Sequence, residues 1–253
     1  MKTIYQEIAN IENSNKPAAL CIVTSTQGSS PRKAGSKMIV FEDGTIMGTI
    51  GGGSIEKEVI DEAQKVIKHK TPFYREYKLK DDVEMLCGGG MEVYIEPIAQ
   101  QEKLIVFGAG HISRTLCKFA IELGFKITVI DERPNIMDDT CFDNCEKLNI
   151  NFDEAIEKIT FDENTFIVIL THKHLNDAEV LKLVCKKKHS YLGMIGSKVK
   201  VAEIKKYFLN KKILSEEEFN LIDTPIGIKL AANTPQEIAV CIVAKLIDVR
   251  NSK

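Results

Sequence analysis

A single cysteine, Cys87, stands directly before three glycines, Gly88, Gly89 and Gly90. Glycine loses more chain entropy on folding than any other residue and adds no side chain to a core, so this run indicates a backbone that a ligand approaches closely. A thiol at the edge of the run is within reach of that ligand. Thiolate is a soft ligand, which favours a soft metal centre as its partner. For Cys87 alone, a small buried hydrophobic residue is the alternative.

Two further segments of the first hundred residues suit an anion. One joins two predicted strands, and the other leads into a predicted helix, whose first amides and positive dipole end attract negative charge. If they converge with the cysteine loop, they suit a phosphorylated ligand that holds a soft metal. The groups are Ser29, Ser30, Arg32, Lys33 and Lys37 in the first segment, and Gly51, Gly52, Gly53 and the predicted N-cap Ser54 in the second.

A glycine pattern of another kind, Gly-Ala-Gly-His-Ile-Ser, begins at Gly108. It follows an apolar strand and opens a helix, so Gly108 allows the tight turn of a dinucleotide site and Gly110 the approach of a pyrophosphate. Asp131 ends the next predicted strand, where a carboxylate accepts ribose hydroxyls. His111 contacts a phosphate or only caps the helix. Ser113 replaces the third glycine, which predicts looser helix–strand packing; the domain binds NAD(P), another nucleotide or nothing.

Two more loops follow predicted strands of the same sheet, and loops at the carboxyl ends of parallel strands line the ligand cleft. After one strand, His172 and Asp177 are placed to face a ligand; a plain surface loop is the alternative. After the next, Gly196, Ser197 and Lys198 precede a helix and suit an anion, or form an ordinary turn.

The elements that must position these groups differ between the two halves. The first half reads as short strands around one helix, with Asp43-Gly44 as a hairpin turn. A polar joint at 100–103 leads to alternating strands and helices, typical of a doubly wound sheet. We therefore predict an α/β chain: a small N-terminal α+β domain, 1–100, and a Rossmann-like doubly wound parallel sheet domain, 101–253. The strands expected are 18–26, 37–41, 45–50, 73–79, 91–97, 104–107, 126–130, 166–170 and 191–195, and the helices 55–68, 112–123, 178–187 and a last one capped by Thr234 with Pro235 and Glu237.

The composition of the chain argues against several classes of protein. The 253 residues carry a net charge of -2 and no apolar run near the roughly 18 residues of a membrane span, which argues against nucleic acid and membrane. The N-terminus is too polar for a signal peptide. Seven scattered cysteines, an odd number, fit a reduced cytoplasm. Eleven acids crowd 131–163 and ten lysines 181–212, as two solvated faces or as a partner-docking surface.

The motifs together resemble the XdhC/CoxI family of xanthine dehydrogenase accessory proteins, over nearly the whole chain. They are GSSPRKAGSKM (28–38), GTIGGGSIE (48–56), CGGGMEVYIEP (87–97), VFGAGHIS (106–113), THKHLND (171–177), YLGMIGSK (191–198) and TPIGIKLAANTPQEIAV (224–240). The sequence departs from the family pattern at Ser113 and Asn233.

The resemblance implies a maturation factor that binds molybdenum cofactor, assists its sulfuration and delivers it to a molybdenum hydroxylase, with a cysteine desulfurase as a further partner. Such a protein needs no turnover of its own. The cysteine of the family motif falls on Cys87, which would contact the molybdenum centre. A homodimer is the expectation from base rates. The implied cofactor site adds Glu56 to the residues of the three N-terminal loops.

Two other functions stay open. One is an NAD(P)-dependent oxidoreductase, for which His172 is the best candidate for an acid–base role. The other is a module that senses a nucleotide and docks a partner through its unevenly charged surface, without cargo.

Overall fold

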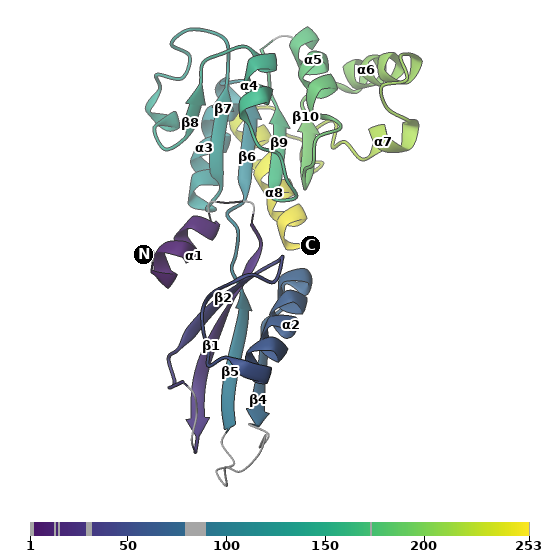
Figure 1. Ribbon diagram of the computed structural model, residues 1–253. Helices are drawn as coiled ribbons and strands as arrows, with labels where there is room; N and C mark the ends of the chain where they lie inside the picture. Colours follow the sequence, from purple (N-terminus) through teal and green to yellow (C-terminus); the bar gives the residue numbers. More distant parts are fainter. Residues whose placement is uncertain are drawn as a thin grey trace. The chain divides into compact units, whose positions relative to one another are not determined.

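A computed structural model of the chain describes residues 3–12, 14, 16–28, 32–78, 90–172 and 174–252. Its internal contacts form two compact units, Met1–Gln100 and Gln101–Lys253, called here the N-terminal and C-terminal units (Figure 1). Within the described residues, every helix is too short or too polar to span a bilayer.

The N-terminal unit is a five-stranded antiparallel sheet in the order β3-β2-β1-β5-β4. One helix packs on each face, because alternate strand residues point to opposite sides. The predicted hairpin around Asp43-Gly44 is confirmed as the β2–β3 pair. The strands are β1 (Ala18–Gln27), β2 (Lys37–Phe41), β3 (Ile46–Gly48), β4 (Phe73–Lys78) and β5 (Gly90–Pro97).

Helix α2 (Gly53–His69) covers one face of this sheet with buried residues three or four apart, namely Ile55, Val59, Ala63 and Val66. Helix α1 (Ile4–Glu12) covers the other face through Ile4, Ile8 and Ile11. The prediction of a single helix in this half was wrong. The isoleucines of α1 do repeat at helical spacing, so the signal was present but short.

The C-terminal unit is a parallel five-stranded sheet in the order β10-β9-β6-β7-β8. The predicted Rossmann-like doubly wound sheet is thereby confirmed. Its strands are β6 (Lys103–Phe107), β7 (Lys126–Ile130), β8 (Glu146–Leu148), β9 (Thr165–Ile169) and β10 (Tyr191–Met194). Strands β6, β9 and β10 are nearly all apolar because both faces of the sheet are covered, whereas the edge strand β8 is polar and mostly exposed.

Helices α3 and α8 cover one face of this sheet, and α4 to α7 contribute to the core on the other (Figure 1). The last helix begins as predicted, with Thr234 as N-cap in a capping box with Glu237. The helices are α3 (His111–Glu122), α4 (Phe152–Lys158), α5 (His174–Val184), α6 (Lys198–Asn210), α7 (Glu216–Asn220) and α8 (Pro235–Asn251), with a short 3₁₀ helix at Thr140–Phe142.

Strand order marks the position where a ligand is expected, called here the Rossmann crevice. From β6 the chain builds the sheet outward through β7 and β8, and then returns to pair β9 on the other side of β6. The loops after β6 and β9 therefore part at a topological switch point, where open α/β sheets bind ligands beside the carboxyl ends of their strands.

Candidate functional site

The segments predicted to bind the phosphorylated ligand leave the N-terminal sheet at the same end. Gln27, the last residue of β1, pairs with Gly90, and Gly90 pairs with Lys78, the last residue of β4. The strand ends from which segments 28–36 and 79–89 continue therefore lie side by side. Strand β3 runs in the same direction as β1, since both pair antiparallel with β2, so the start of α2 points to this end too. Cys87, Gly88, Gly89, Ser29 and Ser30 lie outside the described residues.

A carboxylate from within the chain fills the turn between β3 and α2. Oε2 of Glu56 accepts hydrogen bonds from Oγ1 of Thr49 at 2.5 Å and from the amides of Ile50 and Gly52 at 3.2 and 3.1 Å. The amide of Gly51 donates to Thr49 Oγ1 at 3.1 Å. Two glycine amides that the sequence offers to an anion are thus engaged internally.

The charge of Glu56 suits this position. Burial by itself raises the pKa of the carboxyl, but the hydrogen bonds from Thr49 and the loop amides outweigh it, so the pKa lies below its ordinary value. A negative side chain in the first turn also interacts favourably with the helix dipole. Glu56 therefore supplies the counter-charge that the predicted ligand would otherwise bring.

The glycines of this turn are needed for conformation. Gly52 and Gly53 have φ of 78° and 70°, and a Cβ at either would meet no atom within 4 Å. Gly52 is the N-cap of α2, so the prediction that Ser54 caps the helix was wrong. The left-handed backbone lets the helix begin two residues earlier than the apolar pattern suggested, and Ser54 lies exposed in its first turn.

Lys37, one of the predicted cations of the first segment, does not point to this turn. Lys37 alternates with core residues that face α2, so its side chain lies on the α1 side of the sheet. Its Nζ stands 5.7 Å from the ring centroid of Tyr5 and donates to the carbonyl of Gly35 at 3.1 Å. Arg32 is exposed. The predicted meeting of Lys37 with the helix start is not seen.

In the C-terminal unit, the glycine turn after β6 packs directly against the chain that follows β9. Gly108 has φ of 106°, and a Cβ there would lie 2.3 Å from the carbonyl oxygen of Leu170, at the end of β9. Ser113 is fully buried and donates to the carbonyl of Gly108 at 2.5 Å. The expected looser packing at Ser113 was wrong, because its hydroxyl bonds the turn. Gly110 is the N-cap of α3, and His111, the first helical residue, is exposed.

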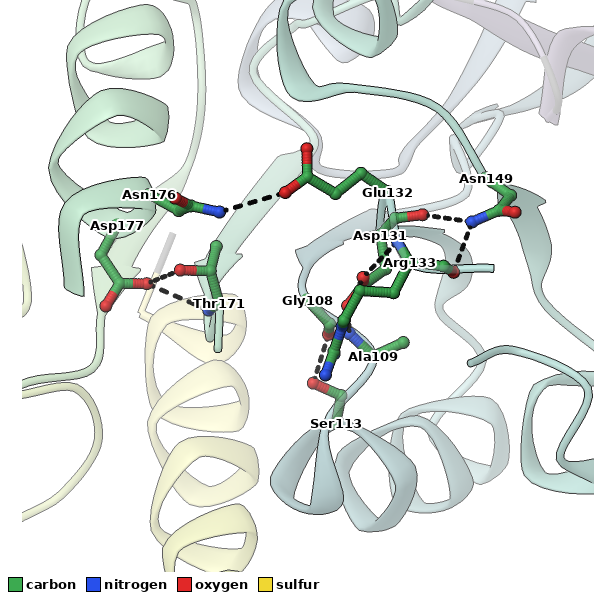
Figure 2. A network of polar contacts seen from close by, with 10 residues as sticks. All are labelled: Gly108, Ala109, Ser113, Asp131, Glu132, Arg133, Asn149, Thr171, Asn176 and Asp177. Atoms are coloured by element: carbon green, nitrogen blue, oxygen red, sulfur yellow. Dashed lines mark hydrogen bonds and ion pairs between the residues drawn. The ribbon is translucent and has the colours of Figure 1, made fainter. Parts of the chain in front are cut away.

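Asp131 stands where predicted, but its carboxylate is occupied (Figure 2). Its side chain is 1% exposed and accepts from the amide of Ala109 at 2.8 Å. Arg133 supplies its amide at 3.0 Å, Nε at 2.9 Å and Nη2 at 2.6 Å. Burial raises the pKa of Asp131, yet these bonds outweigh burial and hold the pKa below its ordinary value. The pair is charged and internally satisfied.

Asp177, on the α5 side of the crevice, also has its carboxylate bound by groups of the chain itself. Asp177 is 1% exposed; it accepts from the amide and hydroxyl of Thr171 at 3.0 and 2.6 Å and pairs with Nζ of Lys200. The expectation that Asp177 faces a ligand does not hold in this arrangement, whereas His172 is exposed. The predicted loop also ends early, because α5 begins at His174.

The third predicted anion loop, after β10, mostly caps its helix. Ser197 is the N-cap of α6 and accepts from the amide of Lys200 at 3.3 Å. Gly196 is partly buried and Lys198 exposed. Within the part of the chain that the structure describes, no three His, Cys, Asp or Glu side chains cluster as metal ligands.

Sequence reasoning missed Arg133 and Lys200. Arg133 follows the strand-end aspartate by two residues, a spacing that allows a turn-closing ion pair. Lys200 precedes Ile204 and Phe208 at intervals of four, so its place on the buried stripe of α6 was readable from helical periodicity.

Fold and sites define a two-domain protein that couples an antiparallel α+β unit to a Rossmann domain. The sequence matches the model of the XdhC Rossmann domain over residues 104–246 and that of the XdhC and CoxI family over residues 12–78. The chain belongs to the XdhC and CoxI family, which confirms the resemblance drawn from its motifs.

Among curated relatives, the protein YqeB of Escherichia coli K12 is 31% identical over 255 residues, covering 98% of this chain and 46% of that protein. A probable xanthine dehydrogenase subunit of Bacillus subtilis 168 is 29% identical over 159 residues, 62% of this chain and 46% of that protein. The chain thus covers less than half of each. The molybdenum cofactor insertion chaperone PaoD of E. coli K12 is 21% identical over 302 residues, 98% of this chain and 88% of that protein.

A solved structure, described as a xanthine dehydrogenase from Bacillus halodurans, matches 98% of this chain and 96% of its own with a TM-score of 0.54 and 23% identity. At that identity the likeness concerns the fold.

Proposed function

We propose that this chain is an accessory protein of a molybdenum hydroxylase of the xanthine dehydrogenase type, which binds molybdenum cofactor and assists its sulfuration and insertion. The observation that carries the proposal is the similarity to the insertion chaperone PaoD, which extends through both units of this chain. In this role the cofactor is cargo, and no turnover is required of the protein.

The cargo site proposed is the loop end of the N-terminal sheet. The paired strand ends support it, because the Cys87 loop and the Ser29–Ser30 segment continue from neighbouring positions of the sheet. Cys87 would bind the molybdenum centre through its thiolate, a soft ligand. Amides and hydroxyls of the glycine and serine residues would bind the pterin phosphate. Glu56 shapes the adjoining turn by bonding its amides.

The proposal includes partners. A molybdenum hydroxylase would receive the cofactor, and a cysteine desulfurase would supply the sulfur for its sulfuration. We further propose that the protein acts in the cytoplasm and as a homodimer, the commonest symmetric assembly.

The test is cofactor retention. The protein is expressed in a host that makes molybdenum cofactor and is purified without oxygen, as wild type, Cys87→Ala and Cys185→Ala. Molybdenum is measured by mass spectrometry and pterin by the fluorescence of its oxidised form. Losing a metal–thiolate bond should lower the molybdenum content of Cys87→Ala by at least about tenfold, equivalent to about 1.4 kcal/mol. Cys185 is a half-buried thiol of the other unit, and its variant should match wild type. Equal retention in all three proteins would remove Cys87 from the site.

A further inference from the structure

The Rossmann crevice contains the acidic residue that a dinucleotide site uses, but in a different role. In such sites a carboxylate at the end of the second strand accepts hydrogen bonds from ribose hydroxyls. Asp131 directly follows β7, the strand beside β6, and so holds that position. Whether it can serve a ribose depends on what its two oxygens already bind.

Every acceptor position of this carboxylate is filled. Oδ1 accepts the amide and Nε of Arg133, and Oδ2 accepts Nη2 of Arg133 and the amide of Ala109. An ionised carboxylate offers about four lone-pair sites, so none is left for a hydroxyl. The two side-chain bonds form the parallel, bidentate geometry that makes arginine–carboxylate pairs strong.

The position of Arg133 is itself fixed from a third strand. Nδ2 of Asn149, just beyond β8, donates to the carbonyl of Asp131 at 2.6 Å and to that of Arg133 at 2.8 Å. Figure 2 shows Asn149 bridging the two carbonyls while the guanidinium folds back beside the glycine turn. Backbone and side chain of Arg133 are thus both held, so moving the guanidinium aside would break several bonds at once.

We infer that Arg133 occupies the ribose position of the Rossmann crevice and that the domain does not bind NAD or NADP. A ribose diol would have to displace a bidentate guanidinium from a carboxylate that is 1% exposed. A 2′-phosphate gains little there, because the charge of Arg133 is balanced by Asp131. The group that the fold implies therefore does not fit the residues present.

The rest of the crevice agrees with this inference. The amide of Ala109 lies in the phosphate-binding turn but is turned to Asp131. Across the mouth, Nδ2 of Asn176 approaches Oε1 of Glu132 at 3.5 Å, which joins the loop after β7 to the start of α5 (Figure 2). A bound dinucleotide would have to separate both contacts.

The experiment is a calorimetric titration of the full chain with NAD and, separately, NADP. Wild type should give no binding with a Kd below about 1 mM. In Arg133→Ala the Asp131 carboxylate is released to the ribose, and NAD should bind at least about tenfold more tightly than to wild type. Arg114→Ala is the matched control: it removes an arginine of the same unit that is about equally exposed and pairs with Asp139 at 3.1 Å. It should behave as wild type.

Two results would overturn the inference. One is wild-type binding of either dinucleotide with a Kd below about 1 mM. The other is a folded Arg133→Ala protein that gains no NAD binding, which would show that Arg133 is not what excludes the ribose. If that variant does not fold, the Nε–H resonance of Arg133 in wild type decides: it should not move on adding NAD, and a shift contradicts the inference.

Discussion

Replacing Lys200 by methionine should destabilise the C-terminal unit strongly. The side chains of Lys200 and Asp177 are 11% and 1% exposed, and they form an ion pair beneath the loop after β9. Methionine fills similar volume but leaves the Asp177 carboxylate buried with Thr171 as its remaining donor. Removing one partner of a buried pair costs about 3 to 5 kcal/mol, against a total stability of about 5 to 15 kcal/mol for a domain.

The size of this effect can be read by calorimetry. For a domain of this size, 1 kcal/mol shifts the melting temperature by about 2 to 4 °C, so the transition of the C-terminal unit should fall by about 6 to 20 °C. The double variant Lys200→Met with Asp177→Asn removes both charges and should recover most of the loss, because no uncompensated charge stays buried and the amide oxygen still accepts from Thr171.

The matched control lies on the same helix. Lys205 pairs with Glu216 at 2.8 Å, and the Glu216 side chain is 68% exposed, so the pair is solvated. Lys205→Met should cost less than about 1 kcal/mol. If Lys200→Met costs no more than this control, or if the double variant loses as much as the single one, the pair is not desolvated in solution and the reasoning fails.

Three other outcomes are expected. Gly108→Ala places a Cβ 2.3 Å from a backbone oxygen at a positive φ, so it should lower the free energy of unfolding in urea by at least about 2 kcal/mol. In the control Gly110→Ala the new Cβ meets no atom within 4 Å, and the loss should be less than about 1 kcal/mol. Equal losses would contradict the close approach at Gly108. Cys145 should react with iodoacetamide faster than Cys185 in timed peptide mapping. A hydrogen bond from the buried Cys117 thiol lowers the pKa of Cys145, whereas burial raises the pKa of Cys185. The reverse order of reaction would refute this prediction. The pKa of Asp131 is lower in the folded chain than its unfolded value near 3.9, so its contribution to stability is present above about pH 4 and is lost as pH falls through the folded value; Asp131→Asn should flatten the acid limb of stability against pH, and an unchanged limb would count against it.

Periodicity and turn chemistry predicted most of the fold. Strands 37–41 and 126–130 were predicted with the bounds the structure has. The start of α2 was missed because a left-handed glycine, not a serine, caps it. The start of α5 was missed because its first turn is polar and looks like a loop. Short elements such as β8 carry too few residues to show a period.

The place of Asp131 at the end of a strand was predicted from the sequence, but the groups that its carboxylate binds were not. A sequence shows that Asp131 ends a strand beside a glycine turn; it does not show that Arg133 returns to occupy it. The same holds for Glu56, whose partners are amides that every sequence possesses. Whether a side chain of the protein itself occupies the position of a ligand depends on side-chain geometry, and sequence spacing alone does not determine that geometry.

The turn that Glu56 organises has a consequence for cargo transfer. A carrier has to give up what it holds, so very tight binding would work against it. At the start of α2, an arriving phosphate must compete with a carboxylate that already holds the amides of Ile50 and Gly52. On the proposed function, that carboxylate would return when the cargo leaves, so the helix end would keep a counter-charge. On the proposed function, this exchange of one anion for another would lower the barrier to hand-over.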